Sequence, residues 1–229
     1  MAITFVAAGA TVEALGGNVT PAIPALAQPG DLLILTVGQA DNVVSTFPAG
    51  WTEVDPTNSG ATTRGTWAWR FFQQGDANPL VTHTAGDVIQ ASILAYRGVG
   101  TVAGLPYTAK SALANASSAT VTATGITPTL PDPAIIFWGA GYGTNSANYS
   151  GYSGTNPTFT EREDVGTGTG LRGGKFLADG SQTVAAATGT RTATSTRVEP
   201  NVGFLIALVN FIPDIKDFSR YPKRPRKQG

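Results

Sequence analysis

The stretch Pro29–Gly38 constrains the fold of this chain most. A Pro-Gly-Asp turn leads directly into the mostly apolar run Leu32–Val37, which ends at a glycine. The run is too short for a core helix, and continuous apolarity is typical of a strand that is covered on both faces. The same pattern, a proline-containing turn followed by an apolar run that ends at a glycine, recurs at Pro131–Gly139. We therefore expect two central strands around which the remaining chain is arranged.

Two further segments alternate in the manner of strands. Gly65–Gln73 places three aromatic side chains on one face: Trp67, Trp69 and Phe71. Val88–Arg97 places four apolar side chains on one face: Ile89, Ala91, Ile93 and Ala95. An aromatic stripe of this kind is more often core than a ligand platform, so we expect it to line the interior together with Leu33 and Leu35.

The chain shows the same series of patterns twice, in residues of about 1–100 and about 113–212. Pro157–Glu161, for example, is similar to Pro48–Glu53 in the first half. No segment shows a sustained 3.6-residue period, so the class is all-β. We expect a two-sheet, jelly-roll-like sandwich over residues 1–212, built from an internal duplication. Each half offers too few strands for a sandwich of its own, which favours one shared core over two separate ones.

Composition excludes several functional classes. The chain has no cysteine, which rules out disulfides and thiolate metal sites. The first residues carry no basic region before their apolar residues, so we do not expect a signal peptide. The longest apolar run, Val202–Ile212, is about half as long as a membrane span requires. We therefore expect neither a membrane partner nor a bound cofactor.

Catalytic chemistry has few candidates in the sequence. The single histidine, His83, has no Gly-x-Ser-x-Gly nucleophile motif to serve, and we interpret it as a surface residue at a strand end. Carboxylates on equivalent turns of the two halves could serve a glycosidase or bind calcium: Glu53, Asp55, Glu161, Glu163 and Asp164. The duplicated turn explains these acids without catalysis or metal binding. We expect no enzyme activity and no metal.

Two segments remain as candidate contact surfaces. Residues 141–152 are rich in Tyr, Ser, Asn and Gly, which is typical of binding loops, with Tyr149 and Tyr152 as candidate contacts. The alternative is an ordinary exposed loop.

The second candidate is a basic C-terminal arm, residues 213–229. It contains six bases and two acids, a net charge of +4, and leaves 9 bases and 13 acids, a net charge of −4, in residues 1–212. Apolar side chains alternate with these bases, so we expect the arm to dock on an acidic protein neighbour; the alternatives are binding to nucleic acid and a disordered tail. Its candidate contact residues are Ile215, Phe218, Arg220, Tyr221, Lys223 and Arg224.

The order of the motifs over residues 1–210 resembles a family of tailed-bacteriophage virion proteins. The resemblance lies in the Pro-Gly-Asp strand at residues 29–38, the Gly-Trp-Thr turn at 50–52 and the Ala-Tyr-Arg-Gly strand end at 95–98. Phe159 replaces the tryptophan in the second turn, and the basic arm has no counterpart in the family.

The resemblance implies a virion structural protein, made in the host cytoplasm and carried on the phage particle. We expect a capsid decoration or cement protein whose partners are the major capsid protein, copies of itself, or both, as a homo-oligomer. The alternative is a tail-associated module that binds a receptor or carbohydrate through the tyrosine-rich loop.

Overall fold

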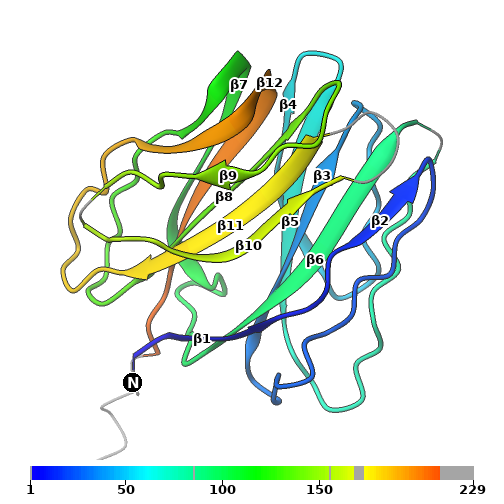
Figure 1. Ribbon diagram of the computed structural model, residues 1–229. Helices are drawn as coiled ribbons and strands as arrows, with labels where there is room; N and C mark the ends of the chain where they lie inside the picture. The colour runs from blue at the N-terminus through cyan, green and yellow to red at the C-terminus, as the bar shows by residue number, and fades with distance from the viewer. Residues whose placement is uncertain (1, 85, 155, 168–172, 212–229) are drawn as a thin grey trace, which may run out of the picture.

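The computed structural model describes residues 2–84, 86–154, 156–167 and 173–211. It shows two antiparallel six-stranded sheets packed face to face, and none of the described residues is helical (Figure 1). The expected all-β, two-sheet sandwich is therefore confirmed.

The first sheet comes from the first half of the chain. Its order is β1-β6-β3-β5-β4, and β2 also pairs with β6. The strands are β1 (Thr4–Ala8), β2 (Val12–Leu15), β3 (Leu32–Gln39), β4 (Thr52–Ser59), β5 (Thr63–Phe71) and β6 (Val88–Arg97). Strand β3 is buried along its whole length, as the apolar run predicts.

The second sheet comes from the second half. Its order is β10-β11-β8-β12-β7, and β9 also pairs with β12. The strands are β7 (Tyr107–Ala123), β8 (Ala134–Tyr142), β9 (Tyr149–Ser150), β10 (Thr160–Gly166), β11 (Gly173–Ser181) and β12 (Arg191–Leu208). Strand β8 is buried throughout, like its counterpart β3.

The two sheets have the same connectivity, in agreement with an internal duplication. Leu32, the first residue of β3, pairs with β5 on one side and β6 on the other. Ala134, the first residue of β8, pairs in the same way with β11 and β12. Consecutive strands stay within one sheet, so the connectivity is simpler than that of a jelly roll, whose chain passes repeatedly between its two sheets.

One apolar core lies between the sheets, and both halves contribute to it. Leu32, Ile34 and Trp67 come from the first sheet and pack with residues of the second. Trp138 and Phe204 stack there with their ring centroids 4.2 Å apart. Gly65 leaves room for this stack, because a Cβ at that position would lie within 3.1 Å of both rings. The two halves therefore share a core that neither sheet can close alone.

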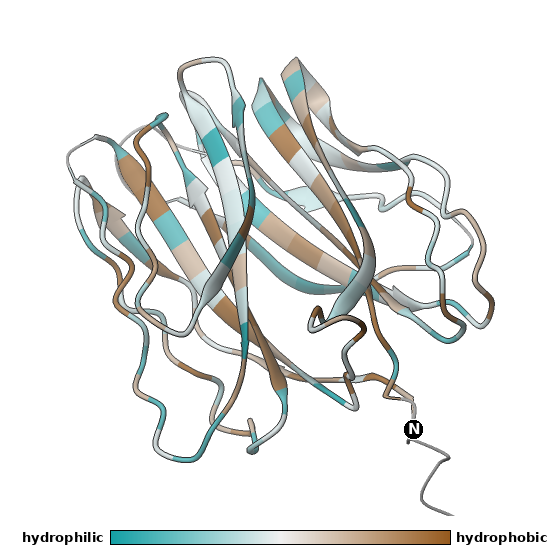
Figure 2. Ribbon diagram, turned by 180° about the vertical axis from the view of Figure 1, so that it is seen from behind, coloured by the Kyte–Doolittle hydropathy of each residue, from teal (hydrophilic) through white to brown (hydrophobic). Residues whose placement is uncertain are grey.

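Two further apolar clusters cover the outer faces of the sheets. On the first sheet, side chains of β3 and β6 pack beneath Val19, Ile23 and Phe47 of the connecting segments. On the second sheet, Phe137 and Phe176 pack beneath the segment that contains Tyr149. Both faces of each central strand are thus buried, which explains their continuous apolar sequences (Figure 2).

The side-chain faces of β3 differ in one respect from the expectation. Trp67, Trp69 and Phe71 share one face, but that face meets Leu32 and Ile34 in the core between the sheets. Leu33 and Leu35 belong to the outer cluster. The expected partnership was wrong because Ile34 pairs with Trp69, and residues paired across antiparallel strands project to the same face.

Three edge strands are irregular. The register shifts between Phe5 and Ala7 in β1, between Val54 and Thr57 in β4, and between Glu161 and Glu163 in β10. Such irregularities interrupt the row of backbone groups that a further strand would need for pairing. The edges formed by β1, β4 and β10 are therefore poor places for a partner to add a strand.

Candidate functional site

The arm itself, with Ile215, Phe218, Arg220, Tyr221, Lys223 and Arg224, lies outside the described residues. The residues that lead into the arm, 209–211, are described, and we call them the arm root. Gly100 donates a backbone hydrogen bond to Val209 at 2.9 Å, and Phe211 donates one to Gly98 at 2.9 Å. The chain thus continues beyond β12 as a short antiparallel ladder beside residues 98–100.

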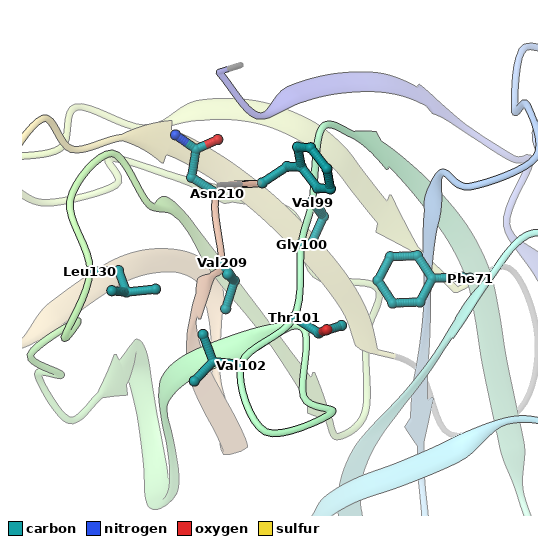
Figure 3. A pocket seen from close by; sticks show the side chains of 9 residues that line it. Phe71, Val99, Gly100, Thr101, Val102, Leu130, Val209 and Asn210 are labelled. Carbon is teal, nitrogen blue, oxygen red and sulfur yellow. The ribbon is translucent and has the colours of Figure 1, made fainter. Parts of the chain in front are cut away.

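An apolar pocket of about 490 Å³ opens at this root, and we call it the root pocket (Figure 3). Its wall combines segments far apart in the sequence: the end of β5, residues 99–102, the crossing before β8 and residues 209–211. The apolar side chains are Phe71, Val99, Val102, Leu130, Val209 and Phe211. Phe211 and Val102 are 50% and 46% exposed, so the pocket presents large apolar groups to solvent.

The hollow surface continues past the root pocket along the same end of the sandwich. A second pocket of about 380 Å³ shares Asn210 with the root pocket and also includes Ile3 and Asp132. A third of about 300 Å³ shares Ile3 with the second and reaches Arg162. The three pockets are therefore neighbours, and their lining is mostly apolar at the arm root and includes more polar side chains near Arg162.

The polar end is held by an ion pair between β10 and β11. Arg162 Nε donates to Asp179 Oδ1 at 2.9 Å, and its guanidinium lies 4.5 Å from the Phe5 ring centroid. Tyr96 donates its hydroxyl to Asp179 Oδ2 at 3.0 Å. Burial raises the pKa of Asp179, while neighbouring Arg162 favours its charged form. Asp179 is thus engaged by two internal partners and is not a free carboxylate.

The tyrosine-rich loop is anchored to the second sheet. Tyr149 is only 3% exposed, and its hydroxyl donates to the Gly174 carbonyl at 3.0 Å. Tyr152 is partly buried, donates to Glu161 Oε2 at 3.0 Å, and packs its ring against Phe137 and Phe176. These contacts fix the loop from within, and they do not favour Tyr149 as a contact for a partner.

The acids considered for catalysis are engaged in structural contacts at separate places. Glu53 accepts a hydrogen bond from Thr66, and Asp55 pairs with Lys110 across the two sheets. Glu161 accepts from Tyr152, as above, and Asp164 accepts from the Tyr149 backbone at 3.1 Å. Within the described parts of the chain, no group of three or more His, Asp or Glu side chains could hold a metal ion.

His83 is buried, so its expected surface position was wrong. Residues 81–82 form isolated bridges to Val19 and Thr46, which bring this segment beneath the first sheet's connecting loops. His83 Nε2 lies 3.2 Å from Asp41 Oδ1, and the histidine side chain is fully shielded from solvent. A substrate therefore cannot reach the His83 side chain.

A buried ion pair of the second sheet, Lys175 with Glu163, lies at the interface with the first sheet, and no sequence pattern predicts it. Lys175 Nζ lies 3.0 Å from Glu163 Oε2 and donates to the hydroxyls of Thr36 and Ser92. Burial lowers the pKa of Lys175, while Glu163 favours its charged form. Thr36 and Ser92 belong to the first sheet, so the network joins the two halves. Nothing in the local sequence distinguishes Lys175 from an exposed strand lysine.

No protein-family model, curated protein or solved structure matches the chain. The described residues include no helix long and apolar enough to cross a membrane.

Proposed function

We propose that this chain is a non-enzymatic structural protein of a tailed phage particle, a capsid decoration or cement protein. The sandwich sits on the particle, and the C-terminal arm attaches it to a neighbouring protein. The observation that carries this proposal is the root pocket, which places exposed apolar side chains where a basic, apolar-spaced arm begins.

The relative energies indicate how such an arm holds. Burying one large apolar side chain contributes about 1.5–3 kcal/mol. An exposed ion pair contributes about 0–1 kcal/mol. The spaced apolar residues of the arm therefore supply most of the attachment, and its charges select an acidic surface.

The rest of the molecule supports a structural role. The two halves share one core, the buried Lys175–Glu163 network ties the sheets together, and three edge strands are irregular. The sandwich is thus tied together from within, and the edges at β1, β4 and β10 do not favour the addition of a further strand.

The number of copies per particle tests the proposal. We expect purified particles to contain the chain in numbers of the same order as the major capsid protein, measured by quantitative mass spectrometry. A few copies per particle, located at the tail, would contradict decoration and support a receptor- or carbohydrate-binding tail module. Absence from purified particles would refute both roles.

A further inference from the structure

We infer that the root pocket receives the arm of a second copy of this chain. This inference rests on the proposed function and names the neighbour that the arm binds. The pocket is the acceptor, and the apolar residues Ile215 and Phe218 are the inserted groups.

The pocket matches the arm in chemistry and size. Its volume of about 490 Å³ lies within the range of about 300–1,000 Å³ that binding pockets occupy. Val102 and Phe211 at its mouth are about half exposed, so apolar surface remains for a partner to cover. Large apolar side chains recur at three-residue intervals from Ile212 into the arm, at Ile215, Phe218 and Tyr221.

Charge also favours this occupant. The arm carries a net charge of +4, and the rest of the chain carries −4. Residues 1–212 of a second copy are therefore acidic overall and attract a basic arm. The second pocket, beside the root pocket, includes Asp132. Long-range attraction of this kind raises the rate of encounter and selects the partner.

The direction of the chain at the arm root favours a second copy over the chain's own arm. Val209 lies opposite Gly100 and Phe211 opposite Gly98, so the chain moves away from Val102 as it leaves the sandwich (Figure 3). The 17 residues of the arm span up to about 60 Å when extended, which is long enough to reach the pocket of a neighbouring copy.

A disulfide trap tests the inference directly, because the chain contains no cysteine. Full-length Val102→Cys and Phe218→Cys proteins, carrying tags of different mass, are mixed and oxidised. We expect a disulfide-linked heterodimer on a non-reducing gel. The matched control replaces Val102→Cys with Leu80→Cys, because Leu80 is 47% exposed but does not line the pocket. We expect several-fold less heterodimer from the control.

Two results would overturn the inference. One is equal trapping at Leu80 and Val102, which would show that the arm does not select the pocket. The other is a doubly substituted chain that closes its disulfide internally at high dilution while the mixed single variants form no heterodimer. The chain's own arm would then be the occupant.

A charge substitution gives an independent readout. Val102→Lys places a cation at an exposed position in the mouth of the pocket, where it repels the basic arm. We expect the mass of the full-length protein in light scattering to shift toward the monomer, whereas Leu80→Lys leaves it unchanged. A mass that does not respond to Val102→Lys would contradict the inference.

Failure of this inference is distinguishable from failure of the proposed function. If arm-deleted protein no longer joins particles but the disulfide yield at Val102 equals that at Leu80, the arm binds the capsid protein, and only the present inference is wrong. If arm-deleted protein still coats particles, attachment through the arm is wrong for any result of the disulfide experiment.

Discussion

At the scale of single residues, Trp67, Trp69 and Phe71 share the face of β5 that packs into the core between the sheets. Their partners in β3 depend on the register between strands, and a slip of one residue exchanges the two faces. Because both faces of β3 are apolar, the sequence contains no signal that fixes this parity.

Burial depth distinguishes the tryptophans of the aromatic stripe. Trp67 is 1% exposed, whereas Trp69 is only partly buried. We predict that Trp67→Ala lowers the free energy of unfolding by about 3–5 kcal/mol, as truncation of large core residues does. Trp69→Ala should cost less. Urea denaturation measures both, and a loss below about 1 kcal/mol for Trp67→Ala would contradict the core assignment.

The carboxyl groups of buried Glu199 and half-buried Asp164 have raised pKa values, which predict how stability depends on pH. Burial raises the pKa of Glu199 from 4.5 to about 7, and the Tyr149 and Arg197 neighbours only partly oppose this. Burial likewise raises the pKa of Asp164 from 3.8 to about 6. The folded state therefore binds these protons more tightly than the unfolded state, so their contribution to stability increases as the pH falls from about 8 to about 5.

Thermal unfolding against pH measures this effect. We predict a higher midpoint near pH 5.5 than near pH 8, and Glu199→Gln should flatten part of the difference, since Gln cannot titrate. A midpoint equally pH-dependent in the wild type and in Glu199→Gln would show that other groups are responsible.

At the scale of elements, apolar runs in the sequence predict the central strands, whereas polar extensions of strands have no comparable pattern. The central strands β3 and β8 coincide closely with the expected segments. Strand β12 begins at Arg191, well before the apolar run that starts at Val202, because its threonine-rich first part pairs with β7 and β9. Alternate residues of this part, Arg191, Ala193 and Ser195, are buried, but a stretch of mostly Thr, Ser and Arg has no hydrophobic pattern that predicts a strand.

The buried network between β10 and β11 predicts an asymmetric response to mutation. Lys175→Met leaves the Glu163 carboxyl buried without its cation, and removal of one partner from such a pair costs about 3–5 kcal/mol. The double variant Lys175→Met, Glu163→Leu removes both groups and should recover much of that loss. Denaturant unfolding of the two variants checks this, and a double variant less stable than the single one would contradict it.

At the scale of the whole molecule, the sequence located the arm but could not reveal the pocket beside it. The net charge of +4 and the regular spacing of apolar residues distinguish residues 213–229 from the rest of the sequence. The root pocket depends on positions as distant as Phe71, Val102, Leu130 and Phe211, which only the packed sandwich brings together. A site assembled by tertiary contacts has no local sequence signature.

Deletion of residues 213–229 tests arm-mediated attachment most directly. We predict a folded, soluble sandwich that no longer joins phage particles, since the shared core lies within the retained residues and the arm holds the contact. Occupancy on purified particles is measured beside the full-length protein, with circular dichroism confirming the fold. Loss of occupancy with the fold retained is the expected result. Truncated protein that coats particles at wild-type occupancy would contradict the arm as the means of attachment.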